Sequence, residues 1–265
     1  MKKRPAKREE AFNRNGTSTS VNRAFAILDV LAAKSESGIA LAETATRLRL
    51  SRSTAHRYLV TLEKLGVIER DAQDRFHLGL KMIELAGRTL TSSDLRRQGE
   101  PFLEELAART EETTHLAVLS GLDVVYIAKG DSARAIRMYS HIGARAPVYS
   151  TALGKAILAY SDSTLFEQVV RNGLTPRTLH SITSRRALSE EIEHVRQHGF
   201  AIDDQENELG VCCVGAPIFD YTCRPIAAIS ISGPADRITP ARQPELGPVV
   251  RDAALRLSRR MGYPK

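Results

Sequence analysis

Two arginines, a histidine and several hydroxyl-bearing residues lie close together after residue 50. Arg52, Ser53, His56 and Arg57 are spaced so that they share one face of a helix that begins after Ser51. Arg side chains can pair with the O6 and N7 atoms of guanine, and Ser and Thr hydroxyls can reach base edges or phosphates. The spacing therefore predicts a helix that lies in the major groove of DNA.

The flanking residues are those needed to position such a helix. Ser51 is suited to cap its first turn, and Gly66 to end it in the left-handed conformation. The opposite face of this helix is apolar and consists of Ala55, Tyr58, Leu59, Leu62 and Leu65. A shorter helical pattern precedes it, formed by Leu41, Ala45 and Leu48. Together they predict a helix-turn-helix over residues 41–66.

A predicted hairpin and a first helix complete this domain. Residues 67–70 and 75–78 form two short β patterns around the turn at 71–74, which is typical of a wing. A helix is expected from Val21, with Phe25, Leu28, Leu31 and Ala32 on its buried face, and Ile39 is expected to add a short strand. The predicted DNA contacts are Arg23, Ser51, Arg52, Ser53, Thr54, His56, Arg57 and Arg75. The alternative is an ordinary helical hairpin with a solvated charged face.

Positive charge is concentrated in the same part of the chain. Residues 1–90 contain 17 Lys and Arg against 10 Asp and Glu, whereas residues 91–265 contain 21 of each. Neutralisation of phosphates dominates sequence-independent DNA binding, so this asymmetry favours a nucleic-acid partner. A membrane-surface segment is the alternative, but no strongly apolar helix face accompanies the basic residues.

Composition limits the remaining possibilities. With 265 residues and 42% hydrophobic content, two domains with real cores are expected. No apolar run approaches the ~20 residues that cross a bilayer, and the basic N-terminus lacks the apolar core of a signal peptide. Cys212, Cys213 and Cys223 are odd in number and lack CxxC spacing, which argues against disulfides and zinc. We therefore expect a cytoplasmic protein without membrane, metal or cofactor.

The predicted organisation has four parts. Residues 1–19 are expected to be a disordered basic tail that either contacts phosphates or only aids solubility, and residues 20–79 the winged domain. Residues 80–94, with Leu80, Ile83 and Leu85 at helical spacing, are predicted to be a linker helix that packs partly against its copy in a partner subunit. Residues 95–265 then form one α/β domain with an antiparallel sheet.

That last domain shows alternating patterns. Helices are expected at 95–109, 151–159, 165–171 and 189–197, strands at 114–119, 124–128, 200–203, 211–219 and 225–232. Gly199 is placed to end the helix before it. Thr239 and Pro240 are expected to start a long terminal helix, as N-cap and first helical residue.

With both halves in view, the chain resembles IclR-family transcriptional regulators from about Val21 to Gly262. The segments that carry the resemblance are 20–24, 50–57, 65–70, 76–79, 151–156 (TALGKA), 199–204 (GFAIDD), 210–218 (GVCCVGAPI) and 227–234 (AAISISGP). Each is weakly specific alone, and their common order and spacing make the resemblance strong.

The resemblance implies a GAF-like domain that binds a small metabolite, a carboxylate in many members. It also implies homodimers, often paired into homotetramers, on a palindromic operator in promoter DNA. By match to the family's pocket positions, the ligand-binding residues are Met138, Ala146, Ala152, Leu153, Asp203, Val211, Cys213, Ser230 and Ser232. Ala152 and Leu153 stand where some glyoxylate- and pyruvate-sensing members have Gly-Ala, and Ala146 replaces a larger Leu. The ligand of those members therefore does not carry over.

General chemistry agrees with an anion at these positions. A helix that begins near Ala152 offers unpaired N–H groups and the positive end of its dipole. Ser230 and Ser232 are two apart on a strand, so their hydroxyls share a face, while Cys213 and Met138 add polarizable, adaptable walls. Asp203, as an acceptor, favours a ligand hydroxyl over a second carboxylate. A packing role is the alternative for each residue taken alone.

An enzyme and a metabolite-binding module without a DNA role are the competing functions. Cys213 with His115, His141 or His180 could form a nucleophile and base, and Ser230 could be a nucleophile. No G-x-S-x-G motif or paired-His metal spacing is present. Gly154-Lys155 falls short of a phosphate loop, since Tyr149 and Ala156 replace its first Gly and its Ser/Thr. A ligand-responsive DNA-binding regulator is the favoured function.

Overall fold

The computed structural model describes residues 18–34, 37–91, 94–132, 134 and 140–264, and of residues 86–91 only the backbone. The chain divides after Leu90 into two units, which are described separately below. Met138 and residues 1–17 of the tail predicted at 1–19 lie outside the described residues, and Thr19, the last residue of that range, is the first residue of a helix.

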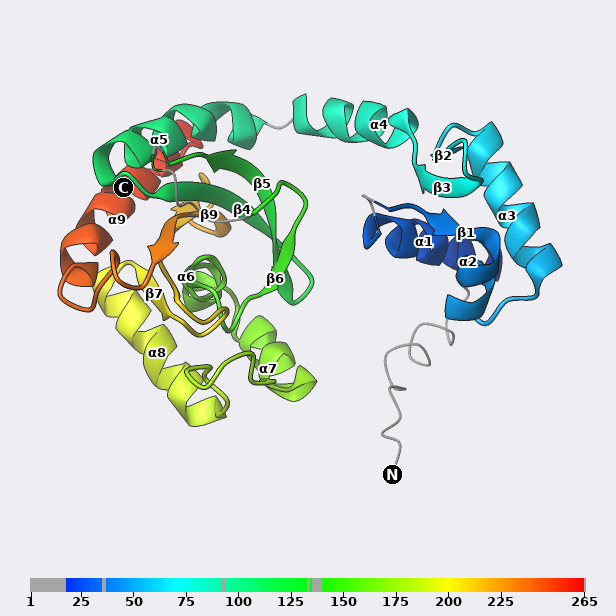
Figure 1. The fold of residues 1–265 in the computed structure, drawn as a ribbon. Coiled ribbons are helices and arrows are strands. Elements are labelled where there is room, and N and C mark those ends of the chain that lie inside the picture. Colours follow the sequence, from blue (N-terminus) through cyan, green and yellow to red (C-terminus); the bar gives the residue numbers. More distant parts are fainter. Residues whose placement is uncertain (1–17, 35–36, 92–93, 133, 135–139, 265) are drawn as a thin grey trace. The chain divides into compact units, whose positions relative to one another are not determined.

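The N-terminal unit is a winged helix-turn-helix (Figure 1). Its elements are α1 (Thr19–Ala32), β1 (Ile39–Ala40), α2 (Leu41–Arg47), α3 (Arg52–Lys64), β2 (Ile68–Arg70), β3 (Arg75–Leu78) and α4 (Leu80–Thr91). The three strands form an antiparallel sheet in the order β1-β3-β2, with Ile39 opposite Phe76 and Ile68 opposite Leu78. The predicted helices, the wing and the added strand at Ile39 are confirmed.

The turns of this unit depend on local capping. Ser51 is the N-cap of α3, and its hydroxyl accepts a hydrogen bond from the Thr54 N–H (3.2 Å). Gly66 follows α3 with a φ of 70°, the left-handed conformation predicted for it. Arg49, in the turn between α2 and α3, also has a positive φ of 52°. These residues fix where the recognition helix begins and ends.

Three apolar side chains of this unit that were predicted to lie on buried faces are exposed: Phe25, Ala32 and Leu65. Ala24, Ile27, Leu28 and Leu31 pack toward the core, whereas Phe25 is 62% exposed. The prediction for Phe25 is wrong because its side chain lies about 100° around the helix from that of Ala24, which packs toward the core. Leu65 is 61% exposed, since α3 ends at Lys64 and Leu65 is its C-cap.

The C-terminal unit is an α/β domain built on a curled antiparallel sheet of six strands, ordered β6-β5-β4-β9-β8-β7. Its strands are β4 (Thr113–Ser120), β5 (Asp123–Gly130), β6 (Arg145–Pro147), β7 (Ala201–Asp204), β8 (Val211–Phe219) and β9 (Pro225–Pro234). Its helices are α5 (Asp94–Thr110), α6 (Ala152–Tyr160), α7 (Ser163–Asn172), α8 (Arg185–His198) and α9 (Gln243–Arg260). The predicted fold class is confirmed, and β6 is an edge strand that sequence analysis did not predict.

Apolar cores cover both faces of this sheet. Helices α5 and α9 pack on one face, around Leu106, Ile229 and Val250, and α6 and α8 on the other, around Ile157 and Leu188 (Figure 1). Gly199 ends α8 in the left-handed conformation, with a φ of 78°. The sheet is therefore rigidly held between two helical layers, and the residues at the start of α6 face its inner side.

The start of the terminal helix was predicted wrongly. Thr239 and Pro240 precede the helix in a turn, where the Thr239 carbonyl accepts hydrogen bonds from the N–H groups of Arg242 (2.9 Å) and Gln243 (3.0 Å). Helix α9 begins at Gln243, with Pro244 in its first turn. The sequence offers two prolines that fit a first turn, and the second one is used.

Candidate functional sites

The outer face of α3 is polar and open. Arg52, Ser53, His56 and Arg57 are all exposed, and the apolar residues Ala55, Leu59 and Leu62 are buried on the opposite side. The first two turns of α3 thus present two guanidinium groups, an imidazole and a hydroxyl on one surface. Such a face can donate hydrogen bonds to base edges and phosphates.

The hydroxyl groups at the start of α3 are partly used within the protein. The Ser51 Oγ lies 2.7 Å from the Thr54 Oγ1 and 3.1 Å from the Ser53 Oγ. Ser51 and Thr54 therefore shape the N-terminus of α3, whereas Ser53 and the charged residues point outward.

Arg23 of α1 lies close to Tyr58 of α3. The pKa of the Tyr58 phenol is lowered, chiefly by a hydrogen bond with the Ser20 side chain and further by Arg23 and Arg57. Arg23 itself is exposed. The structure thus places Arg23 near Tyr58, the residue that follows Arg57 in α3.

Arg75 is placed differently from the other predicted DNA contacts. Its Nε and Nη2 groups donate to the carbonyls of Ser37 (2.5 Å) and Gly38 (2.8 Å), so it holds the loop that precedes β1. Arg70 on the neighbouring strand is likewise engaged, with Glu63 and Asp74, and lies over the Phe76 ring. Both wing arginines therefore use their guanidinium groups within the unit.

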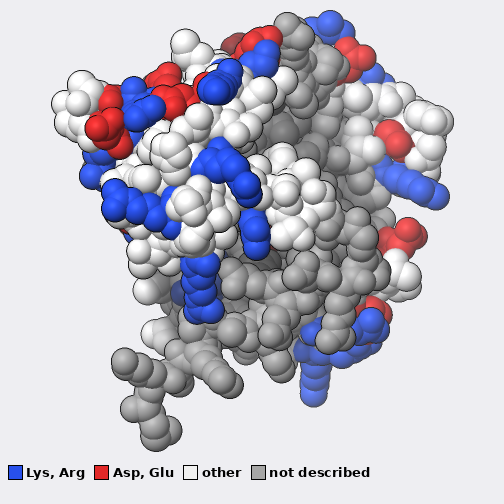
Figure 2. Space-filling model, turned by 90° about the vertical axis from the view of Figure 1, so that its right-hand side faces the viewer, with Lys and Arg blue, Asp and Glu red and all other residues white. Residues whose placement is uncertain are grey.

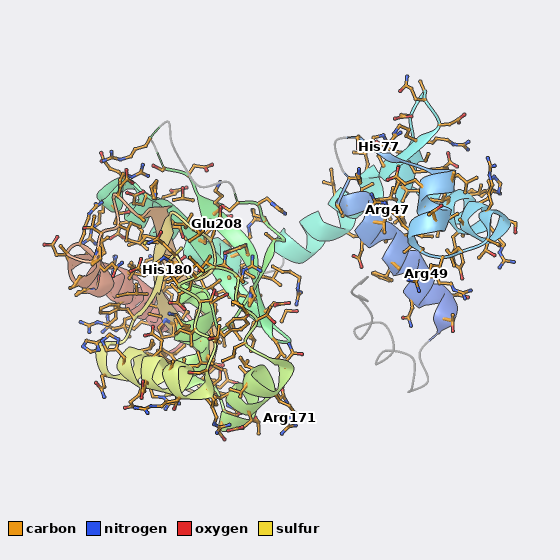
Figure 3. The ribbon with its side chains drawn as sticks, turned by 60° about the horizontal axis from the view of Figure 1, so that its bottom comes forward. Arg47, Arg49, His77, Arg171, His180 and Glu208 are labelled. Carbon is orange, nitrogen blue, oxygen red and sulfur yellow. The ribbon has the colours of Figure 1, made fainter. Side chains whose placement is uncertain are left out.

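Lys and Arg side chains are prominent on the face that Figure 2 shows. Blue side chains cross the middle of this view, while red ones lie mostly toward its edges. Arg47, the last residue of α2, and Arg49, in the turn between α2 and α3, are labelled in Figure 3.

The C-terminal unit contains a cavity of about 190 Å³ on the face of the sheet that α6 covers. All eight predicted ligand-binding residues that the structure describes line it: Ala146, Ala152, Leu153, Asp203, Val211, Cys213, Ser230 and Ser232. Residues that lie up to 86 positions apart in the chain are therefore brought together around one space.

The strand register arranges the polar side chains of the floor. Cys213 on β8 is paired with Asp203 on β7 and with Ser232 on β9. Ser230 is paired with Gly215 on β8 and with His115 on β4. The Ser230 hydroxyl is buried and has no hydrogen-bond partner among the described residues. A polar group left in this state costs free energy, so it is suited to a partner that enters the cavity.

Two glycines and a threonine set the start of α6 against the floor. Thr151 is its N-cap, with its hydroxyl accepting from the Gly154 N–H (3.1 Å). A Cβ at Gly154 would lie 2.3 Å from the Val148 Cα, and one at Gly215 would lie 2.9 Å from the Ala152 carbonyl carbon. Only glycine allows these approaches. The first N–H groups of α6, at Ala152 and Leu153, have no acceptor within the helix.

Burial shifts the titration of the groups around the cavity. It raises the pKa of Asp203 to about 6, against the opposing effects of Lys155 and of hydrogen bonds from the Glu206 (2.8 Å) and Asn207 (3.3 Å) N–H groups. Burial lowers the pKa of His115 to about 4, so its imidazole is neutral near pH 7. It also raises the pKa of the Cys213 thiol well above its usual value.

Two loops form the polar wall. Arg177 of the α7–α8 loop donates to the Asn207 carbonyl of the β7–β8 loop (3.1 Å), and Thr178 donates to the Gln205 carbonyl (2.7 Å). His180 and Glu208, labelled in Figure 3, belong to these loops. The cavity has further lining residues that the sequence did not predict: His115, Tyr126, Ser140, His141, Ala144, Arg145, Thr151, Arg177, Asn207 and Glu208. His115 and His141 were considered only as catalytic bases.

The Gly154-Lys155 pair serves an ion cluster rather than a phosphate loop. The Lys155 ammonium group is fully buried; it contacts the Glu206 carboxylate and lies 3.0 Å from the Glu191 Oε1. Among the described residues, no group of three or more His, Cys, Asp or Glu is placed to hold a metal ion. Nor is any described helix long and apolar enough to cross a membrane.

Comparison with known families covers nearly all of the chain. Residues 20–72 match the family model described as IclR helix-turn-helix domain, and residues 87–259 match that described as Bacterial transcriptional regulator IclR C-terminal. The chain therefore belongs to the IclR family. It is a DNA-binding transcriptional regulator with a ligand-binding C-terminal domain.

Similar proteins support this family assignment over nearly the whole chain. The chain is 38% identical over 247 residues to the HTH-type transcriptional regulator KdgR of Escherichia coli (strain K12), covering 92% of this chain and 93% of that protein. The crystal structure of the Thermotoga maritima IclR matches with a TM-score of 0.75 and 36% identity, covering 92% and 99%. An IclR homolog from Microbacterium hydrocarbonoxydans complexed with 4-hydroxybenzoate shares the fold, with a TM-score of 0.79, 23% identity and coverage of 92% and 99%.

Proposed function

We propose that this regulator senses a small hydroxylated carboxylate in the cavity of its C-terminal domain. The observation that carries the proposal is the buried Ser230 hydroxyl without a partner, on the floor opposite the start of α6. The N–H groups of Ala152 and Leu153 and the hydroxyls of Ser230 and Ser232 supply donors for a carboxylate. Asp203, two strands away from Ser232, supplies an acceptor for a ligand hydroxyl.

The DNA contacts of this proposal come from α3 and α1. Arg52, Ser53, His56 and Arg57 read base edges and phosphates in the major groove, and Arg23 contacts the adjoining backbone. Ser51 and Thr54 contribute mainly by shaping the start of α3, and Arg75 by holding the loop at 37–38. This assignment narrows the predicted set to the side chains that face outward.

We propose further that the protein acts as a homodimer or homotetramer on a palindromic promoter site. The support is the exposure of Leu80 (73%) and Ile83 (69%), which are three residues apart on α4 and share an apolar face suited to a second copy; Leu85 (49%) is exposed on another side of the helix. In this division, residues 20–79 bind DNA, 80–94 link, and 95–265 bind the effector and assemble. Ligand binding favours one subunit arrangement, and this changes how well two winged domains fit two half-sites.

A regulator fits the cavity better than an enzyme does. Cys213 is half-buried, and desolvation raises the pKa of its thiol, which opposes thiolate formation. The Ser230 hydroxyl has no base within hydrogen-bond distance among the described residues. As a DNA-binding regulator the protein is proposed to act in the cytoplasm. Its effect, repression or activation, depends on where its operator lies.

A thermal-shift comparison tests the ligand class. The full chain is heated with L-lactate, D-gluconate or 4-hydroxybenzoate, the last because a fold neighbour was crystallised with it, and with the primary amide of each acid. A bound ligand stabilises by an amount that rises with its occupancy. At least one acid is expected to raise the melting temperature while its amide does not. Equal shifts with acids and amides, or none with any acid, would contradict the proposal.

A further inference from the structure

The His115 imidazole joins two hydroxyl groups across the pocket floor. Its Nε2 atom lies 2.7 Å from the Ser140 Oγ, and its Nδ1 atom lies 3.3 Å from the Ser232 Oγ. The ring also lies 4.9 Å from the Tyr126 ring, centroid to centroid. His115 is 3% exposed, so its contacts are made inside the protein.

The neutral imidazole allows two hydrogen-bond arrangements. With the proton on Nε2, His115 donates to Ser140 and accepts from Ser232, whose only O–H is then consumed within the protein. With the proton on Nδ1, His115 donates to the Ser232 Oγ and accepts from Ser140. Only this second arrangement frees the Ser232 O–H from His115, so that it can donate to a group in the cavity, where its other hydrogen-bond neighbour is the Cys213 thiol.

A carboxylate is an acceptor and therefore selects the second arrangement. Ser232 lines the cavity, and Ser230, cross-strand from His115, offers a second hydroxyl there. We propose that His115 is a positioning residue for the effector, which holds the Ser232 hydroxyl as a hydrogen-bond donor toward the ligand carboxylate. The proposal rests on the proposed function of the cavity as a carboxylate site.

Specificity follows from this chain of hydrogen bonds. When Ser140 donates to His115 and His115 donates to Ser232, the hydrogen bonds all run in one direction, and the Ser232 proton is the one left to donate into the cavity. A carboxylate accepts the last proton, whereas an ammonium group or another donor at this position would meet an O–H that is already directed at it. His115 thus favours anionic acceptors without carrying a positive charge itself, since burial keeps its pKa near 4.

The imidazole proton can be located directly by NMR. The full chain, uniformly labelled with ¹⁵N, is examined at pH 7 by long-range ¹H–¹⁵N correlation of its imidazoles and by amide ¹H–¹⁵N correlation, with acetate, acetamide or chloride at equal concentration. Acetate is the smallest carboxylate probe, and acetamide is its neutral counterpart. The His115 signal is assigned by its loss in His115→Asn. With acetate, the proton is expected on Nδ1.

The outcomes separate this inference from the proposed function. If acetate changes the signals of pocket residues while the His115 proton stays on Nε2, the inference is overturned and the carboxylate site stands. If acetate changes no pocket signal beyond the effects of acetamide and chloride, the proposed function fails and takes the inference with it. A proton on Nδ1 in the presence of acetate supports the inference, whether or not the proton is already on Nδ1 in the absence of acetate.

Variants give an independent readout. His115→Phe keeps the ring and removes both hydrogen bonds, and it is expected to weaken acetate binding roughly tenfold, as for loss of a hydrogen bond to a charged group. In the Ser232→Ala background the same change is expected to have almost no further effect, because the two residues act as a unit. His115→Asn, whose amide can occupy the Nδ1 position, should recover part of the affinity. Additive losses, or no recovery in the Asn variant when it folds normally, would indicate a structural role only.

Discussion

The Lys155 ammonium group, fully buried in α6, donates a hydrogen bond to the Glu206 carboxylate of the β7–β8 loop. Glu191 of α8 completes an ion cluster that joins two helices to a loop of the pocket wall. The second oxygen of Glu206 is buried without a hydrogen-bond partner among the described residues. Stability and pocket shape are therefore coupled at Lys155.

Removing the Lys155 charge is expected to destabilise the C-terminal domain strongly. Lys155→Met leaves Glu206 buried beside Asp203 without a cation, which typically costs about 3–5 kcal/mol. Denaturant unfolding at pH 7 measures the loss. Arg186→Met, which breaks an ion pair between side chains that are 89% and 64% exposed, is the control and should cost less than about 1 kcal/mol. Equal losses in the two variants would show that the buried cluster contributes no more to the free energy of unfolding than an exposed ion pair.

The same cluster is expected to make stability depend on pH. Burial raises the pKa of Glu206 from 4.5 to about 7, so the folded protein holds this proton more tightly than the unfolded chain. Its contribution to stability is therefore fully present below about pH 4.5 and is lost as the pH rises through about 7. Glu206→Gln mimics the protonated group. The stability of the native chain relative to this variant should fall between pH 4.5 and 7, and a constant difference would contradict the raised pKa.

Ser230→Ala is expected to separate stability from ligand binding. The Ser230 hydroxyl has no partner, so its removal should leave the free energy of unfolding unchanged or increase it slightly. Ser258→Ala is the matched control, because that buried hydroxyl accepts from the Phe219 N–H (2.9 Å) and donates to the Ala254 carbonyl (2.7 Å). Its removal should cost about 1–3 kcal/mol.

The functional half of this prediction concerns the effector. Ser230→Ala should weaken binding of the acid identified by thermal shift and reduce its effect on DNA binding, while DNA affinity without the acid stays unchanged. Isothermal titration and fluorescence anisotropy measure the two quantities. A normal response in this variant would place the effector elsewhere.

Arg52→Ala and Arg57→Ala are expected to lower operator affinity by about 1–3 kcal/mol each, through lost base or phosphate contacts. Binding of the acid by the C-terminal domain should be unaffected. Arg186→Ala removes the same charge from α8 and should leave operator affinity nearly unchanged, which controls for net charge. A comparable loss in all three variants would mean that α3 has no particular role.

Local patterns predicted the parts of the fold that local interactions decide. The cap at Ser51, the left-handed Gly66 and Gly199, and the hairpin between β4 and β5 all depend on residues close in sequence. Phe25 was misplaced because the buried face of α1 is set by tertiary contacts of Ile27 and Leu31 with other elements. Helix periodicity alone did not choose between the neighbouring faces.

The residues of the pocket could likewise be predicted only in part from the sequence. Positions matched to the family placed Ala152, Cys213 and Ser232 around one cavity, because the strand register carries them there. The contributions of Arg177 and Asn207 come from loops that meet through hydrogen bonds across 30 positions, and no periodic pattern marks them. Met138 lies outside the described residues, and its role stays a prediction.

The most direct test of the whole account is DNA affinity as a function of salt. Fluorescence anisotropy of the full chain with duplex DNA from its own upstream region is measured over a range of salt concentrations, with and without the selected acid. The account predicts that log Kd rises linearly with log salt, with a slope near 0.9 per phosphate contacted, and that the acid changes Kd in the native chain and much less in Ser230→Ala. Affinity for no duplex at any salt concentration, or a Kd that salt and acid leave unchanged, would contradict it.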